Sequence, residues 1–143
     1  MGDIIIKGSR LKNATVKKKE IPSLIDELPI LMVAACNAEG KTLFEGVEEL
    51  RAKETDRINS MVRNLSKMGA DIRIRQVKAK TNIIIIGTKH LGGTGVSSFS
   101  DHRTAMSMAI AGLKASGKTI IDDINCINKS FPDFLRVLKS LLS

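Results

Sequence analysis

The sequence predicts an α/β domain with a mixed sheet, built from repeated units. Segments with a strand pattern alternate with segments that have a helix pattern, in the order β, α, β, α, β, β, α, β, α. The clearest helix pattern spans residues 57–68, where apolar residues recur every three or four positions and share one face. A short motif at residues 38–42, Ala-Glu-Gly-Lys-Thr, returns in similar form at residues 115–119. Each copy follows a mostly apolar helix pattern and opens a strand pattern, so we expect an internal repeat.

The first third of the chain is expected to hold two strands and one helix. A strand is predicted at Asp3–Lys7, and a basic connector over residues 9–20 follows it. The next helix is nearly apolar all round, with Pro29 in its first turn and Gly40 just beyond its end. A strand is then expected over residues 42–47.

The middle of the chain is expected to contain the amphipathic helix and two further strands. Thr55 or Asp56 can cap the start of the helix at residues 57–68, because a short polar side chain can accept from its free N–H groups. Residues 71–75 alternate between apolar and polar side chains like a half-exposed strand, and residues 82–86 are typical of a buried strand.

The last third of the chain begins with a glycine-rich loop over residues 91–100. A helix is expected from about residue 101 to residue 115, followed by a strand at residues 119–122 and a final helix at residues 131–142. Asp101 is expected to be the cap of the first of these helices rather than a catalytic residue.

The repeat also places charged residues at matching positions. Each apolar helix is entered through an acid, Asp26 in one copy and Asp101 in the other. Each strand that opens with the repeated motif leads to a lysine just before an amphipathic helix, Lys53 in the first copy and Lys129 in the second. A lysine in this position can be an exposed charge near a cap, but its recurrence favours a shared role in binding anions.

The composition is that of one ordinary domain with anionic partners. The chain has 143 residues, of which 43% are hydrophobic and 27% charged, and its formal net charge is +8. The absence of Tyr and Trp argues against a protein that stacks single-stranded bases on aromatic rings. Cys36 and Cys126 match no zinc spacing and fit a reducing compartment. We therefore expect a cytoplasmic protein, with no signal peptide and no membrane span.

The most highly charged stretch, residues 50–58, stands directly before the amphipathic helix. Lys53, Glu54 and Arg57 crowd the N-terminus of that helix, where free N–H groups and the helix dipole favour an anion. Two cations and an acid at this position can grip a phosphorylated or carboxylated substrate and give it a proton. The alternative is a solvated charged cap.

One motif is rejected on its context. Residues 112–119, Gly-Leu-Lys-Ala-Ser-Gly-Lys-Thr, match the Walker A pattern letter for letter. The phosphate-binding loop needs a strand before it and a helix after it, whereas here the helix pattern comes first. Gly117 is therefore interpreted as the end of a helix.

Four motifs resemble the C-terminal part of the 5-enolpyruvylshikimate-3-phosphate synthase family, also called 3-phosphoshikimate 1-carboxyvinyltransferase. They occur in the family's order and the resemblance covers nearly the whole chain. The motifs are Ile-Asp-Glu-Leu-Pro at residues 25–29, Glu-Leu-Arg-Ala-Lys-Glu-Thr-Asp-Arg at residues 49–57, Asp-His-Arg-Thr-Ala-Met at residues 101–106 and Asn-Lys-Ser-Phe-Pro-Asp at residues 128–133.

The resemblance implies an inside-out α/β barrel built from β-α-β-α-β-β units, of which this chain is a partial domain. One complete repeat is expected at about residues 21–88, with partial repeats at residues 1–20 and 89–143. The N-terminal domain of the family is absent from the sequence, which implies a piece cut from a longer chain or a truncated gene product.

The family reaction moves the enolpyruvyl group of phosphoenolpyruvate onto the 5-hydroxyl of shikimate 3-phosphate and releases phosphate. The resemblance implies that Arg57 and Arg103 bind the carboxylate and phosphate of phosphoenolpyruvate, with Lys129 beside them. Glu54 would be the acid that protonates the methylene carbon. The resemblance implies no metal or other cofactor, because arginines and lysines supply the charge stabilisation.

The remaining roles concern the second substrate. The resemblance implies that Lys53 and Asp26 contact shikimate 3-phosphate, with Asp26 also serving as the base. Without the family, Asp26 reads equally well as a capping acid, since it lies three residues after Ser23. His102 is counted among the substrate-binding residues because it stands beside Arg103 in its motif. A fragment without the N-terminal domain is expected to be inactive alone.

Two alternatives remain open at this point. The sister enzyme that makes enolpyruvyl-UDP-N-acetylglucosamine shares the fold and the reaction, although residues 101–103 and the Lys53-Glu54 pair favour the shikimate enzyme. A small basic module that binds RNA or DNA would use residues 17–19 together with Arg73 and Arg75.

Overall fold

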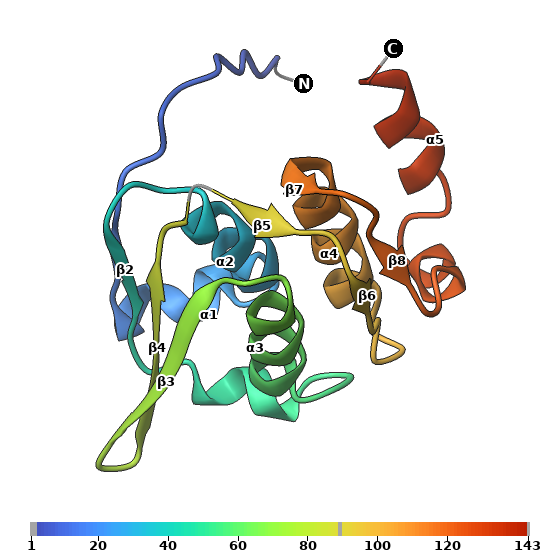
Figure 1. Cartoon of the computed structure of the whole chain (residues 1–143). Helices are drawn as coiled ribbons and strands as arrows, with labels where there is room; N and C mark the ends of the chain where they lie inside the picture. Colours follow the sequence, from blue (N-terminus) through green and yellow to red (C-terminus); the bar gives the residue numbers. More distant parts are fainter. Residues whose placement is uncertain (1–2, 89, 143) are drawn as a thin grey trace.

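A computed structural model describes residues 3–88 and 90–142 and shows a mixed four-stranded sheet (Figure 1). The strands lie in the order β1-β2-β4-β3. Strand β1 pairs with β2 in parallel, whereas β4 pairs with both β2 and β3 in antiparallel fashion. The expected mixed sheet is therefore confirmed. The strands are β1 (Thr15–Val16), β2 (Lys41–Phe44), β3 (Asp71–Val77) and β4 (Lys80–Ile86).

The helices between these strands give the element order β-α-β-α-β-β. Two short helices and α2 connect β1 to β2, and α3 connects β2 to β3. The bounds are η1 (Lys18–Glu20), α1 (Ile21–Leu24), α2 (Leu28–Cys36), η2 (Glu48–Ala52) and α3 (Arg57–Lys67). This order is the one expected of a single repeat, and it includes β1, which lies before residue 21. The division of the chain into repeats itself stays a prediction.

The second half of the described chain repeats part of this arrangement around one long helix. Strands β5 and β6 precede the helix α4, and each pairs in parallel with a strand that follows it, β7 and β8 respectively. Helix α4 packs against both α2 and α3 (Figure 1). The bounds are β5 (Leu91–Gly92), β6 (Gly95–Val96), α4 (His102–Lys114), β7 (Ala115–Ser116), β8 (Ile120–Ile121), η3 (Asn125–Lys129) and α5 (Phe134–Ser140).

Sequence patterns explain where most of these elements begin and end. Asp56 caps α3, as the sequence allowed, because its side chain accepts a hydrogen bond from the backbone N–H of Asn59. Gly40 and Gly117, the glycines of the repeated motif, both adopt positive φ angles of 89° and 84°. Gly40 lies beyond the C-cap of α2 and Gly117 follows β7, so both form the turns before β2 and β8 and neither stops a helix as the sequence predicted. The strand β8 rather than a helix follows Gly117, which confirms the rejection of the Walker A interpretation.

The core is aliphatic and lies between the four-stranded sheet and the helices. In β4 every second side chain is buried, so Ile83 and Ile85 face the helices with no exposed surface. The buried face of α3 contributes Ile58, Met61 and Leu65. Burial of these side chains provides most of the driving force for folding. None of the helices in residues 3–88 and 90–142 combines the length and apolar character needed to cross a bilayer.

Four expectations about elements are wrong. The glycine-rich loop expected over residues 91–100 contains the short strands β5 and β6, each of which pairs with a strand after α4. Asp3–Lys7 forms no strand, and Ile4, Ile5 and Ile6 are each more than 80% exposed, because no described segment pairs with this stretch. The basic connector instead contains β1, which hydrogen-bonds to β2. The final helix begins at Phe134 rather than at residue 131, since a turn around Pro132 precedes it.

Candidate active site

Arg57 is the centre of the charged cluster that the motifs form. It occupies the first position of α3, and its side chain is only 1% exposed. Its Nη1 donates to Asp26 at 3.0 Å and its Nη2 donates to Glu54 at 2.5 Å. Asp101 accepts from both Nε and Nη2 at 3.2 Å. One buried cation therefore holds three carboxylates from three separate parts of the chain.

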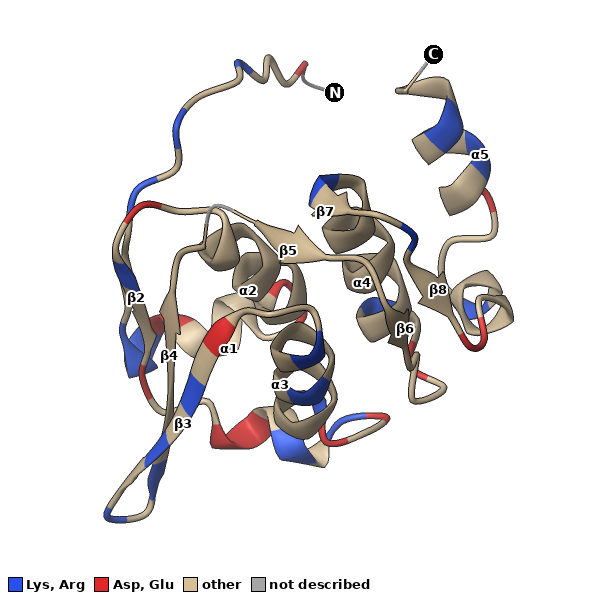
Figure 2. Ribbon diagram, viewed as in Figure 1, with Lys and Arg blue, Asp and Glu red and all other residues tan. Residues whose placement is uncertain are grey.

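The packing of three helices brings these residues together. Asp26 lies in the turn between α1 and α2, Glu54 lies just before α3, and Asp101 is the N-cap of α4. Because α2, α3 and α4 pack against one another, their N-terminal ends meet at one place. Figure 2 shows acidic and basic segments of the chain side by side near the N-terminal end of α3.

Charge pairing explains how an arginine can be buried here. Burial alone would lower the pKa of Arg57, but the hydrogen bonds and charges of Asp101, Asp26 and Glu54 outweigh it, and the pKa is raised. Burial would likewise raise the pKa of Asp101, but hydrogen bonds from Arg57 and Thr104 lower it below the ordinary value. Both groups are therefore held in their charged forms.

Asp101 is the helix cap that the sequence predicts, but it also belongs to the cluster. Its Oδ2 accepts from the backbone N–H of Thr104 at 3.1 Å and from the Thr104 hydroxyl at 2.7 Å. The hydroxyl of Ser60 lies 3.1 Å from that of Thr104. The pairing of Asp101 with Arg57 was missed from the sequence. Its matching position to Asp26 in the repeat was the signal that could have found it.

Arg103 binds the same acid as Arg57. Its Nη1 donates to the backbone oxygen of Asp26 at 2.8 Å, and its Nη2 lies 3.3 Å from the Asp26 carboxylate. Asp26 is therefore held between two arginines rather than acting as a capping acid. Arg103 is 31% exposed, and together with Asp26 and Phe134 it lines a small cavity of about 130 Å³.

The other three residues implied by the resemblance lie nearer the surface or stay unpaired. His102 is the first residue of α4, and its Nδ1 lies 3.9 Å from Asp101. Lys53 and Lys129 are exposed, and neither makes a hydrogen bond or ion pair within the described residues. The structure thus brings Asp26, Glu54, Arg57 and Arg103 together directly, whereas Lys53 and Lys129 do not contact them.

A metal ion is not needed to explain the acids of this cluster. One ligand atom each from Glu54, Asp101 and His102 lie within 4.8 Å of one another, a spacing that a metal ion can use. The Nη2 atom of Arg57 contacts both Glu54 and Asp101, however, and supplies the positive charge at that place. The guanidinium therefore occupies the position that a bound cation would take.

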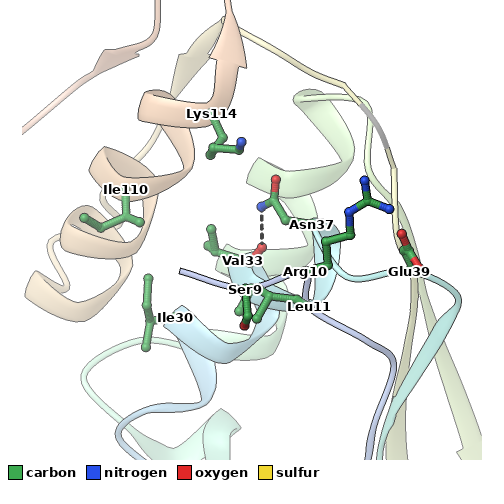
Figure 3. Close-up of a pocket in the computed structure, with 10 residues that line it drawn as sticks. Ser9, Arg10, Leu11, Ile30, Val33, Asn37, Glu39, Ile110 and Lys114 are labelled. Carbon is green, nitrogen blue, oxygen red and sulfur yellow. Dashed lines mark hydrogen bonds between the residues drawn. The ribbon is translucent and has the colours of Figure 1, made fainter. Parts of the chain in front are cut away.

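A larger pocket of about 520 Å³ adjoins the small cavity beside Asp26 and Arg103 and shares Ile30 and Ile110 with it (Figure 3). It is bounded by α2, α4 and the segment at residues 9–11, and its walls are mainly the apolar side chains of Ile30, Val33 and Ile110. None of the site residues expected from the sequence lines it. Such an open apolar pocket suits packing rather than the binding of multiply charged substrates.

Comparison with known proteins decides the family. The family model described as EPSP synthase (3-phosphoshikimate 1-carboxyvinyltransferase) matches residues 2–138. The chain belongs to the EPSP synthase family. It is 45% identical over 141 residues to the 3-phosphoshikimate 1-carboxyvinyltransferase of Thermoanaerobacter sp. (strain X514), covering 99% of this chain and 32% of that protein. The corresponding protein of Petrotoga mobilis is 43% identical over 144 residues and matches 100% of this chain and 32% of its own length.

Solved structures of the EPSP synthase family agree with the fold described above. The EPSP synthase of Acinetobacter baumannii superimposes with a TM-score of 0.81 and 36% sequence identity, covering 92% of this chain and 30% of that one. The expected fold of an EPSP synthase partial domain is thereby confirmed. The chain spans about one third of the length of the curated relatives it matches. Those relatives bear the name of the shikimate enzyme, which favours it over the sister enzyme.

Proposed function

We propose that this chain supplies part of the substrate site of an EPSP synthase. The reaction moves the enolpyruvyl group of phosphoenolpyruvate onto the 5-hydroxyl of shikimate 3-phosphate and releases phosphate. The observation that carries the proposal is the gathering of two arginines and two exposed acids at the meeting point of α2, α3 and α4. The membership of this chain in the EPSP synthase family supports the proposal.

The proposed cation roles follow from charge. Arg57 and Arg103 bind the carboxylate and phosphate of phosphoenolpyruvate, because a guanidinium can donate two parallel hydrogen bonds to such groups. Lys129 adds a further cation beside the two arginines. Lys53 contacts shikimate 3-phosphate, and His102 is a further substrate-binding residue. Neither lysine makes an ion pair within the described residues, so no ion pair has to break before they bind.

The proposed proton transfers use the two exposed acids. Asp26 takes the proton of the 5-hydroxyl while the hydroxyl oxygen bonds to C2 of phosphoenolpyruvate, and Glu54 gives a proton to C3. The resulting tetrahedral intermediate then loses phosphate from C2 and a proton from C3, which restores the double bond. The carboxylates of Asp26 and Glu54 are 42% and 52% exposed and can leave Arg57 when an anion arrives. No metal or other cofactor takes part in this proposal.

The partners and the location belong to the same proposal. The substrates are phosphoenolpyruvate and shikimate 3-phosphate, and the N-terminal domain of the enzyme completes the site. Cys36 and Cys126 are both free and buried, which suits the cytoplasm, where thiols stay reduced.

The test is the affinity of this chain for phosphoenolpyruvate, measured by titrating the ligand and monitoring the NMR spectrum of the protein. Arg103→Gln should weaken binding at least about tenfold, because a charge-assisted contact contributes roughly 1.5–3 kcal/mol. The matched control is Arg63→Gln, since Arg63 is an exposed arginine on α3 that lies over the ring of Phe99, outside the cluster. Equal affinities for wild type and Arg103→Gln would remove Arg103 from the site.

The nucleic-acid alternative has less support. Arg73, on the strand that such a module would use, is held by Asp71 at 2.7 and 2.8 Å. Figure 2 also shows Lys and Arg distributed over β2, β3, α3 and both ends of the chain. Salt-dependent binding of a random oligonucleotide, with no binding of phosphoenolpyruvate, would favour this alternative instead.

A further inference from the structure

We propose that Asp101 is a positioning residue that fixes the guanidinium of Arg57, so that its Nη1–Nη2 edge is the one offered to an anion. Asp101 is absent from the set of substrate-binding and catalytic residues above. The binding of an anion at this edge rests on the proposed function, whereas the fixing of Arg57 by Asp101 does not. It divides the three carboxylates around Arg57 into one permanent partner and two exchangeable ones.

The hydrogen bonds of Arg57 show which edge is fixed. The two oxygens of Asp101 accept from Nε and from Nη2, both at 3.2 Å, and so bind one side of the planar group like a fork. The guanidinium has five N–H groups, and two of them are used in this way. The remaining three are on Nη1 and the outer side of Nη2, where Asp26 and Glu54 contact them.

Burial and hydrogen bonding make Asp101 the partner that cannot move. Its side chain is completely buried, and its Oδ2 also accepts two hydrogen bonds from Thr104. Thr104 is in turn held beside the buried hydroxyl of Ser60. Any rotation of Asp101 would remove the cap of the 13-residue helix α4 and leave a buried arginine without its fork.

Asp26 and Glu54 differ from Asp101 in solvent exposure, which a carboxylate needs in order to exchange one hydrogen-bond partner for another. About half of each of these two carboxylate side chains is exposed. When one of them turns away from Arg57, water can therefore replace the guanidinium as the partner of the carboxylate. A carboxylate or phosphate can then take the Nη1–Nη2 edge with two parallel hydrogen bonds. The bond from Nε to Asp101 persists throughout.

The charge of Asp101 makes the test discriminating. A negative charge beside an anion site repels the anion, so Asp101→Asn would tighten anion binding if charge were the only effect. If Asp101 were a helix cap alone, Asn would replace it with little change, because Asn is an equally good cap. If Asp101 fixes Arg57, the amide offers one oxygen instead of two, and anion binding weakens.

The experiment compares wild type with Asp101→Asn and with the control Asp56→Asn in the full chain. Asp56 also caps a helix and pairs with an arginine, Arg51, but that pair is more exposed, and the Asp56 carboxylate is not among the partners of the Arg57 guanidinium. The first readout is the rate of hydrogen exchange of the Arg57 Nε–H group, monitored by ¹⁵N NMR in the absence of ligand. The second is the affinity for phosphoenolpyruvate.

In wild type we expect a protected Nε–H that stays protected when phosphoenolpyruvate is added. In Asp101→Asn we expect Nε–H exchange about tenfold faster or more, and affinity for phosphoenolpyruvate at least about fivefold weaker. In Asp56→Asn neither quantity should change. Unchanged or tighter binding in Asp101→Asn, or loss of Nε–H protection when phosphoenolpyruvate binds to wild type, would overturn the proposal.

A second variant covers the case in which Asp101→Asn does not fold. Thr104→Val keeps the backbone N–H that Asp101 caps and removes the hydroxyl that holds its Oδ2 at 2.7 Å. Exchange of the Arg57 Nε–H should accelerate in the same direction, and an unchanged rate would count against the proposal. If wild type binds no phosphoenolpyruvate, the proposed function fails. The Nε–H exchange without ligand then still decides whether Asp101 fixes Arg57.

Discussion

At the scale of single residues, the burial of Arg57 determines what the other charges can do. A buried guanidinium needs compensating acids, and Asp101 provides a compensating charge that is itself fully buried. The more exposed acids, Asp26 and Glu54, complete the shell of hydrogen bonds around Nη1 and Nη2. Removal of Arg57 would leave Asp101 buried without a partner, so variants of Arg57 test folding as much as binding.

Glu54 therefore gives a cleaner test of chemistry. Glu54→Gln preserves the shape of the side chain but cannot donate the proton that C3 of phosphoenolpyruvate needs. In the complete enzyme, turnover should fall by about 100-fold or more, while binding of phosphoenolpyruvate stays close to normal. Steady-state rates of phosphate release measure the effect. Turnover equal to that of the unmodified enzyme would reduce Glu54 to an acid near the helix cap.

The ion pair of Asp101 and Arg57 also makes stability depend on pH. Because the folded state lowers the pKa of Asp101, the pair contributes fully above the ordinary pKa of an aspartate and loses its contribution as the pH falls through the lowered value. The free energy of unfolding should therefore fall on acidification below about pH 4. In Asp101→Asn this part of the pH dependence should disappear. Urea unfolding at several pH values measures it, and parallel curves for the two proteins would contradict the expectation.

The sequence predicted the members of the site better than their contacts. The motifs singled out Asp26, Glu54, Arg57 and Arg103, and the fold brings these four residues together, while their roles in binding and catalysis stay a prediction. They could not show that Arg57 is buried, because burial depends on how α2, α3 and α4 pack. For the same reason the second role of Asp101 stayed hidden behind its role as a cap.

At the scale of elements, α3 joins the four-stranded sheet to the second half of the chain. Asn64 is buried on this helix, and its amide binds the backbone of Ser97 twice, donating to the oxygen at 2.7 Å and accepting from the N–H at 3.0 Å. Lys67, one turn further along, donates to the oxygen of Gly95. These contacts hold the loop before α4 and thereby help to place the N-terminus of α4 beside Arg57.

Asn64→Ala tests this connection. The change removes both hydrogen bonds and leaves the backbone groups of Ser97 without them, so stability should fall by about 1–3 kcal/mol. Asn59→Ala is the matched control, since Asn59 is exposed on the same helix, and its effect should stay within about 0.5 kcal/mol. Chemical unfolding of the two variants measures both values. Equal stabilities would show that the amide of Asn64 does not hold the loop.

Elements with a strong local pattern were predicted well, and elements that depend on a distant partner were not. The helix α3 and the strand β4 follow from the spacing of their apolar residues. Residues 3–7 have the composition of a strand, but a strand needs a neighbour to accept its hydrogen bonds. The two-residue strands β1, β5, β6, β7 and β8 are set by pairing alone, which no local pattern reveals.

At the scale of the whole molecule, the chain carries one wall of the proposed site. The charged cluster is open to water on the side of Asp26 and Glu54. Water there weakens the charge interactions on which the transition state depends. The family comparison covers only about one third of the curated relatives, so the remaining contacts to the substrates are expected to come from other parts of those proteins.

We therefore expect this chain alone to fold but to have no synthase activity. Orientation of two bound substrates contributes several kcal/mol, roughly 7–11 in favourable cases, and one wall cannot provide it. The measurement is phosphate release from phosphoenolpyruvate and shikimate 3-phosphate, first with the chain alone and then with an added N-terminal domain from a relative. Turnover by the chain alone at the rate of a full-length relative would refute the need for a second wall.

The position of β4 in the sheet has a consequence for the order in which the protein folds. A turn of two residues, Lys78 and Ala79, joins it to β3, so this hairpin can close in microseconds. Pairing of β2 with β4 must first close the longer loop that contains α3, which costs more chain entropy. Strand β1 can join only after β2 is in place. We expect the sheet to assemble from β3 towards β1, the reverse of the order in which these strands leave the ribosome.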